Sequence, residues 1–151
     1  MQMTDMEVCD MRRKYELVTN DTIDINGRML YRIRALKDFG TVKAGDLGGY
    51  IGSEYNLSHQ GTCWVADEAR VYDEAEISGE AKVFGKARVF GKARVYGEVK
   101  VSGRAEIFGE ALVSGEVKIF GGAWVYDEAW VFGEAEISCK ARVYDEAKSI
   151  W

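Results

Sequence analysis

The sequence contains no proline among its 151 residues. Proline cannot donate a backbone hydrogen bond, so within β-sheets it is confined to edge strands, first residues and bulges. Its complete absence therefore suits a chain in which every backbone N–H serves a hydrogen-bonded ladder. Glycine, in contrast, occurs 17 times.

Cysteine and histidine are scarce as well. The three cysteines, Cys9, Cys63 and Cys139, are odd in number and far apart, which argues against a disulfide framework and for reduced thiols. There is no CxxC pair and no His/Cys cluster, so nothing indicates zinc. We expect neither a metal nor a cofactor.

Long apolar runs are also missing. No run approaches the roughly 20 residues that span a bilayer. The opening residues MQMTDMEVCDMRRKYEL place acids before bases and lack the apolar segment of a secretory signal. The net charge of -5 and the pI of about 5.0 weigh against nucleic-acid binding. We expect a cytoplasmic protein without membrane or nucleic-acid partners.

What the chain does contain is a six-residue repeat. Residues 69–146 form thirteen unbroken hexads of the pattern A-x-[VI]-x-[GD]-x. The third position is always Val or Ile, and the first is Ala except at Val99 and Val117. The fifth is Gly in nine hexads, with Asp73, Asp127, Asp145 and Cys139 in the others. Self-similarity at a fixed short period indicates a β-solenoid.

The period excludes a helix. At about 100° per residue, successive valines six apart would point in different directions and build no apolar stripe. Alternating Ala and Val instead fit a short strand whose first and third residues point inward. The following Gly or Asp supplies the positive φ of a sharp corner. Each hexad is therefore expected to be one strand and one corner.

The stretch VYDEAEISGEAKVFGKARVFGKARVYGE resembles the repeat of hexapeptide-repeat proteins, which form left-handed parallel β-helices and include many bacterial acyltransferases. The preceding VKAGDLGGYI and NLSHQGTCWV resemble the YdcK-like group of that family. Together these segments cover about residues 41–148. The resemblance implies three hexads, or eighteen residues, per coil, a triangular cross-section and a left-handed turn. We therefore expect an all-β fold with three strands per coil.

The segment before the repeat is expected to form a cap. DTIDINGRMLYRIRAL predicts a β-hairpin turning at Asn26-Gly27. We divide the chain into a cap, 1–44, and a β-helix, 45–151, whose first coil, 45–68, is irregular and whose regular hexads span 69–146. A solenoid end exposes unpaired strand edges. With few residues after 146, we expect another subunit or a target to cover the C-terminal end.

Stacking residues eighteen apart sorts the outward side chains into columns on three faces. The first face carries an aromatic ladder made of Tyr72, Phe90, Phe108, Tyr126 and Tyr144. On the other two faces, aromatic residues alternate with Ser. The ladder either stabilises adjacent coils or is buried against a partner subunit. Both explanations stay open at the level of sequence.

Tryptophan adds a second group of interface candidates. Trp124 falls on the first face, Trp130 on the second one coil after Leu112, and Trp151 ends the chain. Tryptophan is enriched at interfaces and uncommon on surfaces without a use. These residues are expected at an interface; packing under the C-terminal tail is the alternative.

Charge is sorted between columns as well. The third face carries Lys82, Lys100 and Lys118, with Lys86, Arg104 and Lys140 at its corner, and the corner of the second face carries Glu80, Glu98, Glu116 and Glu134. Solvated surface charge is the ordinary explanation. Opposite columns would also suit a cyclic homo-oligomer, a trimer or dimer. If an anionic ligand binds, its candidate site is Lys82, Lys86, Lys100, Arg104 and Lys118.

We find no catalytic residue. The family's acyltransferases normally use a histidine base, and the single histidine, His59, lies in the irregular first coil without a family motif. We therefore expect a non-catalytic, oligomeric solenoid that binds another protein. Because resembling sequences occur in bacterial and phage genomes, a phage-encoded inhibitor of a host defence factor is one form of this hypothesis; a sequestrant of an anionic ligand is another. The alternative is an acyltransferase-like enzyme with a site at a subunit interface.

Overall fold

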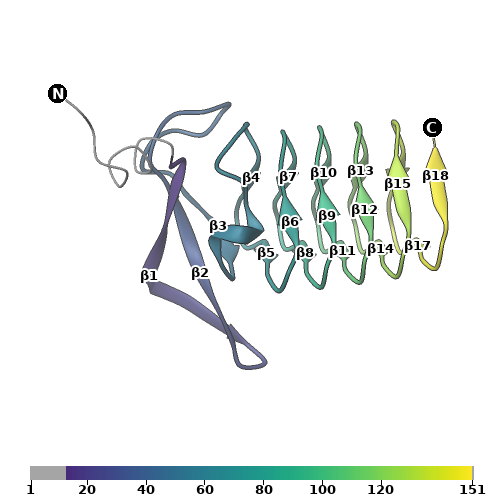
Figure 1. The fold of residues 1–151 in the computed structure, drawn as a ribbon, viewed down its shortest axis with the longest axis horizontal. Helices are drawn as coiled ribbons and strands as arrows, with labels where there is room; N and C mark the ends of the chain where they lie inside the picture. The colour runs from purple at the N-terminus through teal and green to yellow at the C-terminus, as the bar shows by residue number, and fades with distance from the viewer. Residues whose placement is uncertain (1–12, 151) are drawn as a thin grey trace.

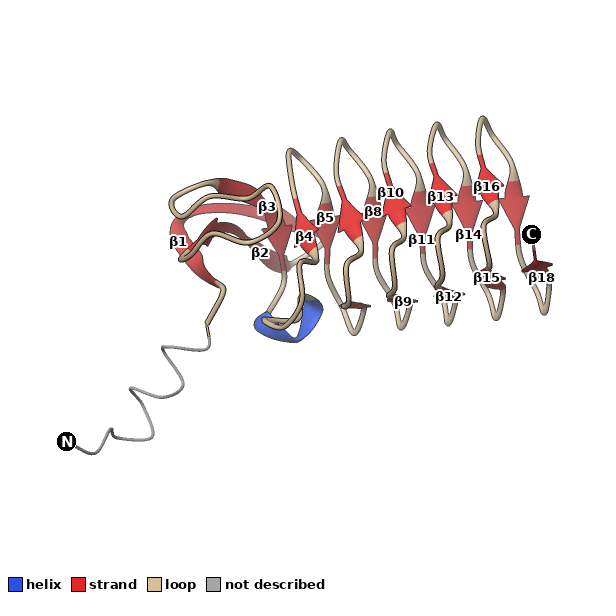
Figure 2. Ribbon diagram, turned by 90° about the horizontal axis from the view of Figure 1, so that it is seen from above, coloured by secondary structure: helices blue, strands red, loops and turns tan. Residues whose placement is uncertain are grey.

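The chain forms a β-solenoid in which short strands stack along one axis (Figures 1 and 2). The computed structural model describes residues 13–150. Its strands belong to three sheets, and each complete regular coil contributes one strand to each sheet. The stacked strands pair in parallel at a separation of eighteen residues, as between Lys100 and Lys118. The all-β solenoid expected from the hexads is therefore confirmed.

The first sheet runs in the order β1-β2-β3-β5-β8-β11-β14-β17. Its strands are β1 (Tyr15–Ile25), β2 (Arg28–Ala35), β3 (Leu47–Ile51), β5 (Arg70–Val71), β8 (Arg88–Val89), β11 (Glu106–Ile107), β14 (Trp124–Val125) and β17 (Arg142–Val143). The first face is the outer surface of β5, β8, β11, β14 and β17. This sheet continues from the solenoid into the N-terminal hairpin (Figure 1).

The other two sheets have five strands each and lie wholly within the solenoid. The second face is formed by β6 (Glu76–Ile77), β9 (Arg94–Val95), β12 (Leu112–Val113), β15 (Trp130–Phe132) and β18 (Lys148–Ile150). The third face is formed by β4 (Trp64–Val65), β7 (Lys82–Val83), β10 (Lys100–Val101), β13 (Lys118–Ile119) and β16 (Glu136–Ile137). A single 3-10 turn, η1 (Glu54–Asn56), interrupts the irregular first coil among the described residues.

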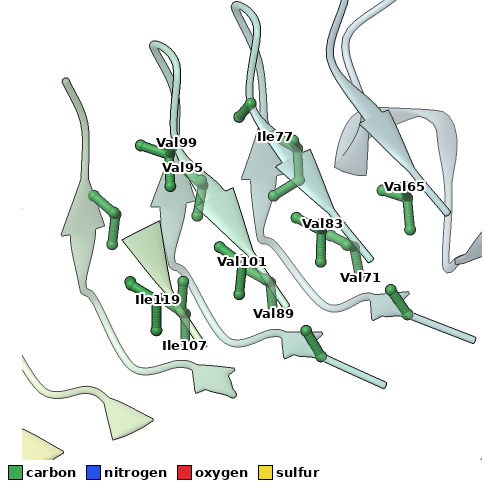
Figure 3. Close-up of a cluster of buried hydrophobic side chains, with 14 of the residues drawn as sticks. Val65, Val71, Ile77, Val83, Val89, Val95, Val99, Val101, Ile107 and Ile119 are labelled. Carbon is green, nitrogen blue, oxygen red and sulfur yellow. The ribbon is translucent and has the colours of Figure 1, made fainter. Parts of the chain in front are cut away.

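The interior is filled by the first and third residues of each hexad. From Ala69 to Val131 each of these side chains is at most 1% exposed, and Figure 3 shows the valines and isoleucines in inward-pointing rows. Each such methyl-rich side chain contributes about 1.5–3 kcal/mol when fully buried. The narrow interior admits only small residues opposite one another, which explains the alternation of Ala with Val or Ile.

The corners have the backbone conformation that the fifth position predicts. Gly103 has φ +66°, and a β-carbon there would lie 2.8 Å from the backbone nitrogen of Gly121 in the next coil. The non-glycine corners Asp73, Asp127, Cys139 and Asp145 share the positive φ, at 57–59°. Positive φ disfavours most side chains, so the repeat keeps glycine at most corners.

The N-terminal hairpin covers the first coil. β1 and β2 pair antiparallel and turn at Asn26 and Gly27, both with positive φ, as the Asn-Gly dipeptide predicts. β2 pairs antiparallel with β3, which pairs in parallel with β5. The edge of β3 is thereby paired with the chain's own hairpin, and β1 is the outermost strand of the first sheet. Within residues 13–150, no helix has the length and apolar character needed to cross a bilayer.

Candidate functional site

The aromatic ladder is present as a continuous stack. Successive ring centroids of its five members lie 5.1, 5.0, 5.0 and 5.4 Å apart, and adjacent planes differ by 14° or less. Trp124 meets Phe108 and Tyr126 edge-on, and the Arg142 guanidinium lies 4.0 Å from the Trp124 ring. The column therefore stabilises neighbouring coils in the way cross-strand aromatic pairs do.

The first end of this ladder is covered by the hairpin. Tyr72 is only 5% exposed and belongs to a buried cluster with Leu30 and Tyr50. Ile23 and Ile25 of β1 pack on the same cluster, together with Phe90. Arg28, near the hairpin tip, forms an ion pair of 2.8 Å with Asp73, the residue that follows Tyr72.

Beyond the hairpin, the ladder becomes progressively accessible. Phe108, Trp124 and Tyr126 are half-buried, and Tyr144 is 48% exposed. One of the two sequence-based explanations placed all five rungs at an interface with a partner subunit. In the structure, Tyr72 is buried against the chain's own cap, so the later rungs are the accessible ones for a second molecule. Trp151 lies outside the described residues.

The second face has an apolar groove, which we call the second-face groove. Its volume is about 200 Å³ and its outward lining is Tyr96, Leu112, Ser114, Trp130 and Phe132. Leu112 and Trp130 are register partners in β12 and β15. Trp130 is 46% and Tyr96 42% exposed, so the groove leaves large aromatic surface in water. The Lys148 ammonium lies 5.1 Å from the Trp130 ring centroid and flanks one end.

The five cations proposed for anion binding are divided between two places. Lys82, Lys100 and Lys118 form a lysine column that shares a groove of about 560 Å³ with the glutamate column. The glutamate column consists of Glu80, Glu98, Glu116 and Glu134. Carboxylates beside each ammonium offset its attraction for an anion, so this groove is of mixed charge.

The other two cations lie at the corner between the third and first faces. Lys86 and Arg104 line a hollow of about 460 Å³ together with Arg88 and Glu106. Arg88 was not selected from the sequence, because it belongs to the first face, although it follows Lys86 by only two residues. Binding of an anionic ligand stays a prediction, and this hollow holds three of the cations that could serve it.

His59 is an anchor for the N-terminal segment. Its Nδ1 accepts the Lys14 backbone N–H at 3.0 Å, and its Nε2 lies 2.7 Å from Glu54 Oε1. Its ring stacks on Tyr15 at 4.1 Å. With Nδ1 accepting, the proton of a neutral ring resides on Nε2 and is donated to Glu54. Both ring nitrogens thus have partners within the chain. For His59 to act as a general base, Lys14 or Glu54 would have to give up its hydrogen bond to the ring.

Sequence reasoning missed the buried contacts around this histidine. Lys14 is fully buried, and its ammonium donates to the Cys63 carbonyl at 2.7 Å and lies 3.3 Å from Cys63 Sγ. Burial lowers the pKa of Lys14 and raises the pKa of the Cys63 thiol. Tyr15 is also fully buried, and its hydroxyl donates to the Leu57 carbonyl at 2.6 Å. These residues fasten β1 to the irregular coil.

Comparison with known proteins gives no family for the chain. No protein-family model matches it, and no curated protein matches it either. The fold and the three outer faces therefore supply the observations on which a function can be argued.

Proposed function

We propose that this protein is a non-catalytic, self-associating β-solenoid that binds another protein through its outer faces. The observation that carries the proposal is the exposure of Tyr96 and Trp130, which share the second face of coils whose inward side chains are fully buried. Tyr144 adds a further exposed aromatic ring on the first face. Exposed aromatic side chains grouped on one face are typical of protein interfaces. The rigid stack supplies a surface that needs little ordering before contact.

We also propose that the chain is a hexapeptide-repeat protein, and within that family a YdcK-like one. The support is the hexad itself, since each of the thirteen repeats folds as one strand and one corner. This assignment concerns architecture. Because the same fold serves unrelated activities, it adds no argument for catalysis.

Self-association is proposed for the first face, beyond the hairpin. Phe108, Tyr126 and Tyr144 supply apolar surface there. One edge of this face carries Lys86, Arg104 and Lys140, whereas the other carries Glu110, Glu128 and Glu146. A second copy turned about an axis parallel to the stack brings unlike edges together, which favours a dimer or trimer.

The proposal can be tested by light scattering on the wild-type chain and on Trp124→Ala/Tyr144→Ala. We expect the wild type to be a dimer or trimer of the 16.9 kDa chain and the double variant to shift toward monomer, because two interface anchors are removed. The control, Phe84→Ala/Phe120→Ala, removes two aromatic side chains from the third face and should leave the mass unchanged. An equal mass for all three proteins contradicts self-association through the first face.

An acyltransferase-like enzyme with a site at a subunit interface is the competing function. It would require turnover of acetyl-coenzyme A by the same oligomer, and loss of that turnover in His59→Ala if this histidine were the base. We expect no turnover, because both ring nitrogens of His59 are engaged within the chain.

A further inference from the structure

The second-face groove lies between two rows of carboxylates. On one side is the glutamate column. On the other is a hollow of about 740 Å³, the carboxylate edge, where the first and second faces meet. Its lining residues are Gly109, Glu110, Asp127, Glu128, Asp145 and Glu146. All five carboxylates are exposed, and their aspartates occupy successive corners one coil apart.

The two rows differ in how far they are neutralised. The glutamate column shares its groove with Lys82, Lys100 and Lys118. The lining of the carboxylate edge, in contrast, contains no cation among the described residues. Like charges held one coil apart, about 4.8 Å along the stack, repel one another and sum to a negative field. Neutralising cations from a partner would relieve that repulsion.

The same carboxylates argue against a second copy of this chain on the second face. Its two edges carry glutamates at Glu98, Glu116 and Glu134 on one side and Glu110, Glu128 and Glu146 on the other. Turning one second face onto another therefore sets carboxylate against carboxylate in either orientation. Like-charge juxtaposition across an interface suppresses that pairing, so a different molecule is the better occupant.

We propose that the second-face groove binds a basic protein segment, one that places large apolar side chains on Trp130 and Leu112 and lysine or arginine on the carboxylate edge. This inference rests on the proposed binding function and adds the chemistry of the partner. The apolar side chains bury the exposed aromatic surface, and the cations neutralise the unpaired carboxylates. Buried aromatic anchors supply affinity, and the charges supply orientation and rate of association.

The test measures fluorescence anisotropy of three labelled synthetic peptides of equal length with the full chain, at low and physiological salt. One peptide alternates Lys with Leu, the second Lys with Ser, and the third Glu with Leu. The Lys/Leu peptide is expected to bind about tenfold tighter than either of the others. It alone offers both leucine for the second-face groove and lysine for the carboxylate edge. Its affinity should fall as salt rises.

Variants assign the binding to the site. Trp130→Ser should weaken the Lys/Leu peptide about tenfold, whereas the conservative Trp130→Tyr retains most of the affinity. Glu128→Gln/Glu146→Gln should weaken it several-fold and flatten the salt dependence. The matched control, Glu68→Gln/Glu106→Gln, changes the net charge equally on the opposite side of the first face and should have little effect.

The outcomes separate the two proposals. If Trp130→Ser weakens binding but the Glu128/Glu146 variant equals the wild type, the groove binds but the basic chemistry is wrong. If the control pair weakens binding as much as Glu128/Glu146, the attraction is general charge and the inference fails. If no Trp130 variant changes binding of any peptide, the groove is not a binding site, and the proposed function loses this surface as well.

Discussion

At the scale of single residues, Tyr15 links the hairpin to the irregular first coil. Its buried hydroxyl donates to the Leu57 carbonyl at 2.6 Å and lies 3.2 Å from the Glu54 carbonyl. Its ring is also the surface on which His59 stacks. Removing the hydroxyl leaves buried carbonyl oxygens without a donor, which costs about 1–3 kcal/mol.

Tyr15→Phe should therefore lower the free energy of unfolding by about 1–3 kcal/mol at pH 7. The difference in unfolding free energy between the wild type and this variant should narrow at alkaline pH. Burial, and then the Glu54 carboxylate, raises the pKa of Tyr15 above its ordinary value near 10. The unfolded tyrosine ionises near pH 10 while the folded one does not, so its contribution is full below pH 10 and is lost above it. Urea unfolding of both proteins at pH 7 and pH 11 measures the difference, and other titrating groups cancel in the comparison. A gap that stays constant or widens would show that Tyr15 is not the titrating contact.

These contacts show where sequence reasoning stops at the residue scale. The pairing of Lys14 with Cys63 and of Tyr15 with Leu57 joins positions more than forty residues apart. Both lie outside the hexads, so no period relates them. His59 could be recognised as a lone histidine, but its two partners, Lys14 and Glu54, follow from the path of the cap over the first coil.

At the scale of the element, each corner must turn sharply while the next coil passes close by. Gly103 has positive φ, and the nearest atom to an added β-carbon is backbone of Gly121. The aspartate corners share the positive φ and add a side-chain hydrogen bond to the next coil. The carboxylates of Asp67, Asp73 and Asp127 accept the backbone N–H of the next corner at 3.1, 3.2 and 3.2 Å.

Gly103→Ala should destabilise the chain by about 1–2 kcal/mol from the left-handed conformation alone, and further through contact with Gly121. Gly103→Asp should cost less, because its carboxylate can accept the Gly121 N–H as the native aspartates do for their neighbours. Thermal unfolding of the two variants beside the wild type gives the order. Alanine as stable as glycine, or aspartate worse than alanine, would contradict this account of the corner.

The elements were the part of the fold that the sequence predicts best. Inward Ala and Val and a positive-φ residue at every sixth position determine strand, corner and interior together, from Ala69 onward. The Asn26-Gly27 turn likewise follows from local chemistry. In residues 45–68, however, only β3, β4 and the turn η1 form, and their order could not be obtained from a period that is absent there.

At the scale of the whole molecule, function depends on how columns meet at edges. The sequence places Trp130 and Leu112 in one column and the five ladder rings in another. In the structure, the members of each column are neighbours in adjacent coils. The sequence did not predict that the N-terminal hairpin packs over Tyr72. Nor did the sequence identify the carboxylate edge, which the fold assembles from corner residues and the glutamates that follow them in successive coils.

All of these surfaces depend on one claim, that eighteen residues make one coil and sort the side chains onto three faces. Disulfide trapping tests it directly, in a chain with Cys9→Ser and Cys139→Ser and with the buried Cys63 retained. Lys100 and Lys118 are register partners in adjacent strands, about 4.8 Å apart and within reach of a disulfide. Lys100→Cys/Lys118→Cys should therefore cross-link within one chain on mild oxidation, as seen by peptide mass mapping. Lys100→Cys/Leu112→Cys, two hexads apart and on different faces, should stay reduced; a bridge between 100 and 112 with none between 100 and 118 would contradict the three-faced coil.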